Sequence, residues 1–409
     1  MADLSPLAPR AYPDMPRIGG ARLGAMACGI RYKSRTDLCL FALPAGTTAA
    51  GVFTKSLTAG APVLWCRKAL KGGKARAIVV NSGNSNAFTG KLGEVAVRKT
   101  VAAVAANLGC KPNEVLVAST GVIGEPLPYQ KIVDALPTLA GQLGENGWRQ
   151  AAEAIMTTDT FPKLATRTAK IGDSVVTING IAKGSGMIAP DMATMLAFVA
   201  TDAKIPAPVL QSLLAAGTAR SFNAITVDGD TSTSDTLILC ATGAVAHKRV
   251  AKASDGHLRG FKAALDELLI DLAQQVVRDG EGATKFVAVS VTGAATAKAA
   301  RRIGLAIANS PLVKTAIAGQ DANWGRIVMA VGKSGEKANR DKLAIRIGGV
   351  KITEKGGRVP NYDEAPVAAH MKGQNIDIAV DVGVGKSSAT VWTCDLTHGY
   401  IAINGDYRS

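Results

Sequence analysis

One stretch of the sequence combines the residue types that a self-cleaving protein needs. It reads Lys183-Gly-Ser-Gly-Met-Ile-Ala-Pro-Asp-Met-Ala-Thr194-Met-Leu, so a glycine-rich turn leads to the small Ala193 and then to the hydroxyl of Thr194. A threonine hydroxyl can attack the preceding carbonyl only where the backbone bends and the preceding side chain is small. Cleavage between Ala193 and Thr194 would give Thr194 a free α-amine, whose ordinary pKa of about 8 suits a general base for its own hydroxyl. The stretch is therefore compatible with a threonine nucleophile that needs no histidine.

The same local pattern also fits an ordinary structural turn. Threonine before a strand and Gly-Ser-Gly turns are both common, so the pattern alone favours the structural interpretation. The order of motifs along the rest of the chain reverses that preference. These motifs are Asn81–Asn86, Ser119–Gly124, Met156–Thr160, Lys183–Leu196, Asp228–Asp235, Asp279–Lys285, Ser310–Thr315, Asp321–Arg326 and Asn404–Ser409.

With these motifs the sequence resembles the ornithine acetyltransferases of the ArgJ family over essentially its whole length. It departs from the family pattern at Ser85, where alanine is usual, and at Phe88, where cysteine is frequent. The resemblance implies a precursor that cuts itself between Ala193 and Thr194. The resulting α chain (1–193) and β chain (194–409) would stay associated, as two α and two β chains. It also implies an α/β fold, a self-cleaving N-terminal-nucleophile-like αββα sandwich of the DmpA/ArgJ type over residues 1–283, with a C-terminal α+β domain over residues 284–409.

The activity implied by the resemblance is acetyl transfer from N-acetylornithine to glutamate in arginine biosynthesis. The mechanism would be ping-pong, through an acetyl ester on Thr194, and would need no cofactor. The oxyanion-stabilising pair falls on Thr120 and Gly121, where a strand end and a glycine turn can bring donors together. Substrate-binding positions fall on Thr157, Lys183, Thr194, Glu281, Asn404 and Ser409.

Each of these positions also has a structural interpretation. Ser119-Thr-Gly would be a plain turn, Lys183 a solvated lysine rather than a partner for a substrate carboxylate, and Glu281 a loop carboxylate rather than a partner for an amino group. Asn404 and Ser409 lie at a chain end, where residues are normally frayed. Only the resemblance makes these last two site residues.

Three other functions stay open. The enzyme could also accept acetyl-CoA as donor, and the sequence has no glycine-rich phosphate loop that decides this. It could be a related N-terminal-nucleophile aminopeptidase or amidohydrolase. The net charge of +15 also suits nucleic-acid binding, but lysine and arginine are spread along the chain without interleaved aromatics, which argues against it.

The composition and the residue spacing also argue against a membrane span, a secretory signal and a metal site. No apolar run reaches the roughly 18 to 20 residues of a membrane span, and no secretory signal is visible, so a cytoplasmic protein is expected. The histidines and cysteines form no zinc pattern, and the six cysteines are expected to be free thiols. The run Asp228–Asp235 looks like a calcium loop but has Leu239 where the twelfth-position glutamate belongs, so no metal is expected.

Apolar periodicity predicts the elements that must position these residues. Strands are expected over 77–81, 115–118, 174–179, 195–201, 236–241, 285–291, 343–352, 376–382 and 388–394. Helices are expected over 92–108, 129–144, 148–156, 206–221, 259–278 and 311–318. Residues 1–20 are expected to form a proline-rich surface arm.

Overall fold

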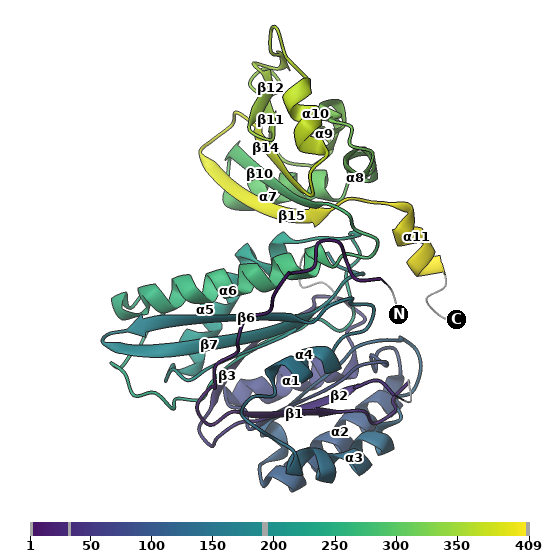
Figure 1. Cartoon of the computed structure of the whole chain (residues 1–409). Coiled ribbons are helices and arrows are strands. Elements are labelled where there is room, and N and C mark those ends of the chain that lie inside the picture. The colour runs from purple at the N-terminus through teal and green to yellow at the C-terminus, as the bar shows by residue number, and fades with distance from the viewer. Residues whose placement is uncertain (1–2, 32–33, 190–194, 406–409) are drawn as a thin grey trace.

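Two β-sheets lie face to face in the larger part of the molecule, and a third sheet forms a separate layer beyond them (Figure 1). The computed structural model describes residues 3–31, 34–189 and 195–405. Among these residues no helix combines the length and the apolar character that crossing a bilayer requires.

The first sheet has four strands in the order β1-β2-β4-β5. They are β1 (Arg22–Met26), β2 (Leu38–Ala42), β4 (Ala77–Asn81) and β5 (Val115–Ser119). Every residue of β2, β4 and β5 is buried, as expected of strands covered on both faces. Helices α2 (Gly90–Leu108) and α3 (Tyr129–Gly141) cover the outer face, where α3 tolerates Pro137 within it.

The second sheet has five strands in the order β3-β9-β8-β7-β6. They are β3 (Thr48–Phe53), β6 (Lys163–Ile171), β7 (Ser174–Lys183), β8 (Leu196–Thr201) and β9 (Thr236–Ala241). Its outer face is covered by α5 (Ala207–Arg220) and by α6 (Arg259–Arg278), whose apolar residues form one buried stripe.

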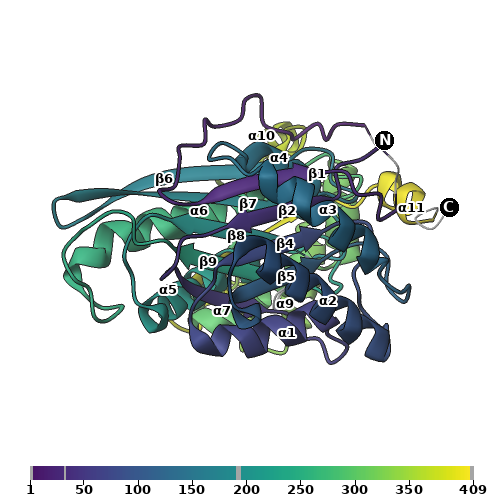
Figure 2. The same cartoon turned by 90° about the horizontal axis from the view of Figure 1, so that it is seen from below.

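The two sheets meet through aromatic side chains. Phe41 of β2 lies with its ring centroid 5.7 Å from that of Phe198 of β8 and 6.0 Å from that of Trp148. Two short helices, α1 (Ala61–Ala69) and α4 (Trp148–Ala154), also lie between the two sheets (Figures 1 and 2). The predicted αββα sandwich is therefore confirmed, with two short helices inserted between its sheets.

The third sheet runs in the order β13-β12-β11-β14-β10-β15 and has its own hydrophobic core. Its strands are β10 (Phe286–Ala294), β11 (Ala344–Ile347), β12 (Val350–Glu354), β13 (Gly357–Arg358), β14 (Asn375–Asp381) and β15 (Ser387–Cys394). The accompanying helices are α7 (Ala297–Ala308), α8 (Pro311–Ala318), α9 (Trp324–Gly332) and α10 (Ala365–Met371). From its end, α11 (His398–Gly405) reaches back toward the larger part of the molecule (Figure 1).

Local sequence explains several helix ends. The Thr296 and Ser310 hydroxyls accept hydrogen bonds from backbone N–H groups in the first turns of α7 and α8, and Pro311 opens α8, where its missing N–H costs nothing. Gly109 ends α2 with a left-handed conformation at φ +60°.

Most predicted elements are found within a few residues, but two predictions need correction. The strand predicted over 343–352 is a hairpin of β11 and β12, because Gly348 and Gly349 both have positive φ, as a two-residue turn requires. The predicted N-terminal arm is anchored rather than free, since Leu7 and Ile18 are buried and the Ser5 hydroxyl donates to the Arg278 carbonyl oxygen at 2.7 Å.

We expect Phe41→Ala to destabilise the fold, because it removes the ring that joins the two sheets and is only 2% exposed. A buried phenylalanine truncated to alanine costs about 3–5 kcal/mol. The measurement is chemical unfolding followed by tryptophan fluorescence. Leu57→Ala, at a fully exposed position, is the control and should unfold like the unmodified protein. Equal stability of the two variants would contradict the proposed role of the contact.

Candidate active site

A cavity of about 220 Å³ gathers most of the residues predicted for the site. Six of them line it: Thr120, Gly121, Thr157, Lys183, Glu281 and Asn404. They come from the end of β5, the loop after α4, the end of β7, the loop after α6, and α11. The predicted nucleophile Thr194, its neighbour Ala193 and the predicted binding residue Ser409 lie outside the described residues.

Thr120 and Gly121 follow β5, which runs parallel to β4. The Ser119 hydroxyl donates to the Asn81 side-chain oxygen at 2.7 Å, and the Thr120 N–H donates to the Asn81 carbonyl oxygen at 3.0 Å. Gly121 has φ +130°, and a Cβ there would lie 2.3 Å from the Gly83 carbonyl carbon. The close approach of the two backbones therefore requires glycine, and it brings the Thr120 hydroxyl and the Gly121 backbone to the cavity.

Lys183 is buried at the end of β7, so it is not the solvated lysine of the structural interpretation. Its Nζ donates to the Thr157 hydroxyl at 2.8 Å and to the Thr120 hydroxyl at 3.2 Å. Burial lowers the pKa of Lys183, and the Asp159 carboxylate, 3.9 Å away, opposes that shift. A substrate carboxylate entering the cavity would supply a second counter-charge for this ammonium group.

A buried charge cluster lies beneath the cavity and was missed by sequence reasoning. Lys163 Nζ lies 2.7 Å from an oxygen of Asp159 and 2.7 Å from an oxygen of Asp279, and all three side chains are fully or almost fully buried. Asp159 also accepts the backbone N–H groups of Thr157 and Gly184, at 2.9 and 2.6 Å. The cluster therefore fixes the backbone on both sides of the Lys183–Thr157 contact.

The charge state of Asp159 follows from these contacts. Burial favours the neutral form, but the ammonium groups of Lys163 and Lys183 and the hydrogen bonds that it accepts outweigh burial, so the pKa of Asp159 lies well below its ordinary value. The sequence signals were that Asp159 and Asp279 each lie in one of the family motifs, Met156–Thr160 and Asp279–Lys285.

Glu281 and Asn404 meet on another wall of the cavity. The Asn404 side-chain amide donates to a Glu281 carboxylate oxygen at 2.7 Å, so Asn404, on α11, is held in place by this contact. Burial raises the pKa of Glu281, against the opposing effect of hydrogen bonds from Asn404 and Thr158. Gly186 is needed here, because a Cβ at that position would lie 2.3–2.6 Å from the Glu281 carboxylate.

The acidic run Asp228–Asp235 holds the chain on both sides of the predicted cleavage position. The Asp228 carboxylate accepts the backbone N–H groups of Met187 and Ile188, at 2.6 and 2.9 Å. The Asp235 carboxylate accepts the Met195 N–H at 3.0 Å. Asp228 and Asp235 therefore act on backbone amides, and no group of three potential metal ligands occurs among the described residues.

The comparisons with known proteins decide the family. The ArgJ family model matches residues 22–409. The chain belongs to the ArgJ family. It is 62% identical to the arginine biosynthesis bifunctional protein ArgJ of Gluconobacter oxydans, over 99% of this chain and 96% of that protein. It is 58% identical to the ArgJ protein of Agrobacterium fabrum, over 99% of both. A crystal structure of an ArgJ protein from Bacillus halodurans is 40% identical, with a TM-score of 0.48, over 50% of this chain and 95% of that one.

We expect Lys163→Met to destabilise this ArgJ protein strongly, because it leaves Asp159 and Asp279 buried without the cation between them. Removing one partner of a buried ion pair costs about 3–5 kcal/mol. Thermal unfolding measures the effect, with the exposed Lys333→Met as the control.

The loss of stability in Lys163→Met should depend on pH. The folded-state pKa of Asp159 is depressed, so its stabilising contribution is complete above the unfolded-state pKa of about 4 and is lost as the pH falls below it. The stability gap between Lys163→Met and the unmodified protein should therefore narrow in acid. A gap that stays constant from neutral pH to pH 3 would contradict the charged state of the cluster.

Proposed function

We propose that this protein transfers an acetyl group from N-acetylornithine to glutamate, as an enzyme of arginine biosynthesis in the cytoplasm. The observation that carries the proposal is the convergence of Thr120, Gly121, Thr157, Lys183, Glu281 and Asn404 on one cavity. Its ArgJ relatives are named arginine biosynthesis bifunctional proteins, which supports the same pathway.

In the proposed cycle, the Thr194 hydroxyl attacks the acetyl carbonyl carbon while the α-amine of Thr194 takes its proton. The Thr120 hydroxyl and the Gly121 N–H donate to the oxygen that becomes negative. The C–N bond then breaks, the proton goes to the leaving amine, and ornithine departs. The amine of glutamate attacks the acetyl ester, which returns the Thr194 hydroxyl and gives N-acetylglutamate. No cofactor enters the cycle, and the cavity must keep water from the ester.

The charges around the cavity suit the proposed donor. The Lys183 ammonium binds the substrate carboxylate, and Glu281, oriented by Asn404, accepts the side-chain ammonium of ornithine. The nucleophile becomes available when the chain cuts itself at Ala193/Thr194, and the α and β chains remain together as an α2β2 assembly.

A second donor, acetyl-CoA, is a further proposal. The word bifunctional in the names of the relatives favours it, since one ester intermediate can be formed from either donor. An aminopeptidase or amidohydrolase of the same fold would instead release the acyl group to water. Measuring free acetate beside N-acetylglutamate separates transfer from hydrolysis.

We expect the purified protein to contain two fragments, one ending at Ala193 and one starting at Thr194, and Thr194→Ala to remain a single chain of 409 residues. Alanine has no hydroxyl to attack the preceding peptide. Intact-mass spectrometry measures both, and Thr194→Ser, which keeps a hydroxyl, should still cut. One uncut chain in every sample would overturn the proposed nucleophile.

Thr120→Val is expected to lower kcat about 10²- to 10³-fold, the usual effect of removing one oxyanion donor. Valine keeps the branched shape but has no hydroxyl, and Thr120→Ser restores the donor. Steady-state kinetics with N-acetylornithine and glutamate is the measurement. An unchanged kcat in Thr120→Val, or an equal loss in Thr120→Ser, would exclude the hydroxyl from this role.

A further inference from the structure

The proposed reaction poses a charge problem for the site. Ornithine ends in an ammonium group and glutamate in a carboxylate, yet both must bring their α-nitrogen to one nucleophile. Glu281 suits the ammonium, but it would repel the side-chain carboxylate of glutamate. A second, positively charged subsite must therefore open onto the same cavity, and this inference rests on the proposed function.

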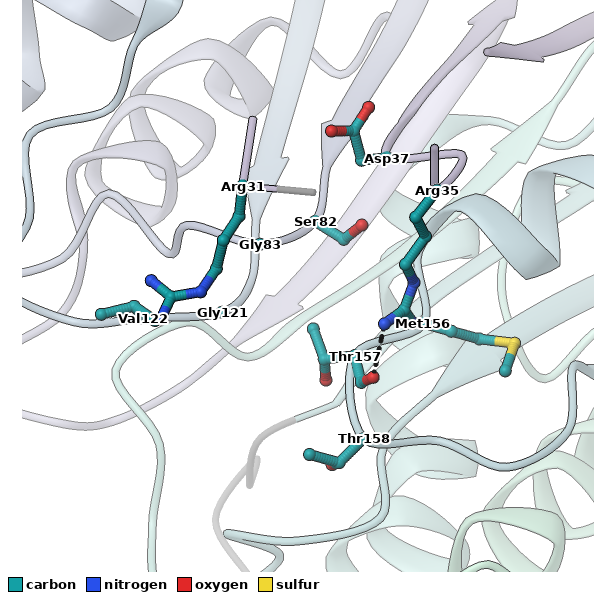
Figure 3. A pocket seen from close by; sticks show the side chains of 10 residues that line it. All are labelled: Arg31, Arg35, Asp37, Ser82, Gly83, Gly121, Val122, Met156, Thr157 and Thr158. Atoms are coloured by element: carbon teal, nitrogen blue, oxygen red, sulfur yellow. Dashed lines mark hydrogen bonds between the residues drawn. The ribbon is translucent and has the colours of Figure 1, made fainter. Parts of the chain in front are cut away.

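A small chamber next to the cavity has this character (Figure 3). Arg31 and Arg35 line it together with Ser82 and Gly83, and it shares Gly121 and Thr157 with the active-site cavity. Both arginines belong to the connection between β1 and β2, and Figure 3 shows Arg31 reaching toward Gly121 and Val122 and Arg35 toward Thr157. Arg31 thus reaches the candidate oxyanion site at Gly121, and Arg35 reaches the predicted binding residue Thr157.

Arg35 is tied directly to the active site. It is half-buried, and its Nη1 donates to the Thr157 carbonyl oxygen at 2.9 Å, while the Thr157 hydroxyl accepts from Lys183. Thr157 therefore lies between two cations, an ammonium in the main cavity and a guanidinium in the chamber. A molecule with two carboxylates would thus meet one cation on each side of Thr157.

One acidic residue, Asp37, also lines the chamber, and its carboxylate is already engaged by the backbone. Both carboxylate oxygens of Asp37 accept backbone N–H groups, from Cys28 at 2.7 Å and from Ile30 at 2.6 Å. Asp37 thereby holds the chain just before Arg31. The Arg31 guanidinium lies 3.5 Å from Glu125, whose side chain is 58% exposed, so this ion pair is largely screened by water.

We propose that the chamber formed by Arg31 and Arg35 binds the side-chain carboxylate of the acceptor, while Glu281 and Asn404 bind the side-chain ammonium of the donor. Arginine suits this role because its planar guanidinium group can bind a carboxylate through two parallel hydrogen bonds. The size agrees, since the chamber offers about 40 Å³ and one water needs roughly 10–15 Å³ by the same measure. That is room for a carboxylate and too little for a nucleotide.

The test compares Arg31→Met and Arg35→Met with the unmodified enzyme. Methionine keeps much of the side-chain volume without the charge. We expect the KM for glutamate to rise roughly 10- to 100-fold, the loss typical of a hydrogen bond to a charged group, with the KM for N-acetylornithine nearly unchanged. The preference for glutamate over glutamine as acceptor should fall in parallel. Arg35→Lys should recover part of the effect, and Arg340→Met, at a side chain 93% exposed, should have none.

Three outcomes would overturn the subsite. An unchanged KM for glutamate would exclude the arginines from acceptor binding. Equal rises for donor and acceptor would mean that Arg35 only supports Thr157. A rise in the KM for acetyl-CoA alone would assign the chamber to phosphate groups instead.

The first half-reaction, release of ornithine with acetylation of the enzyme, is measured separately by mass spectrometry. Its absence in the unmodified enzyme would reject the proposed function, whereas its presence with unaltered acceptor kinetics would reject only the subsite.

Discussion

The active-site cavity depends on one buried ionic cluster. Lys163 joins Asp159, whose carboxylate fixes the backbone at Thr157 and Gly184, to Asp279, which lies two residues before Glu281. Asp279 also accepts the N–H and the hydroxyl of Thr160. Buried charges are costly unless fully partnered, so an arrangement that separated Lys163 from its two aspartates would be disfavoured. The cluster thereby positions two walls of the cavity relative to each other, the wall that carries the Lys183 ammonium and the wall that carries the Glu281 carboxylate.

Two glycines in close contact with neighbouring segments also shape the site. Gly121 touches the Gly83 backbone, and Gly186 touches the Glu281 carboxylate, at distances that leave no room for a Cβ. Asp228 and Asp235 then hold the chain at Ile188 and Met195, on either side of the predicted cleavage position. Ionic, steric and hydrogen-bonding constraints thus fix the backbone around the cavity at Gly121, Gly184 and Ile188, so these walls are organised before any substrate arrives.

Much of the framework could be predicted because its signals are local. Continuous apolar runs identified β4 and β9, and helical periodicity identified α6 with the observed bounds. The strand β2 is a short apolar run of the same kind but was missed, together with its antiparallel partner β1 just before it in the chain. The meeting of Lys183 with Thr157 was implied only by family resemblance, since nothing in either segment specifies the other. Lys163 was missed because a lysine suggests surface exposure until its two aspartates are brought to it by the fold.

The topology of the second sheet has a consequence for the independence of the two proposed chains. β7 precedes the predicted cut and β8 follows it, yet the two are antiparallel neighbours paired from Ile178↔Thr201 to Lys183↔Leu196. The same sheet continues to β6 on one side and to β9 and β3 on the other, so β8 and β9, which follow the cut, lie between strands that precede it. A cut there would open the covalent connection without exposing a strand edge. Each fragment made alone would instead carry an incomplete sheet with unpaired backbone groups, a template for aggregation. Heterologous production of the two chains from separate messages would therefore face a solubility barrier that a single translated precursor avoids.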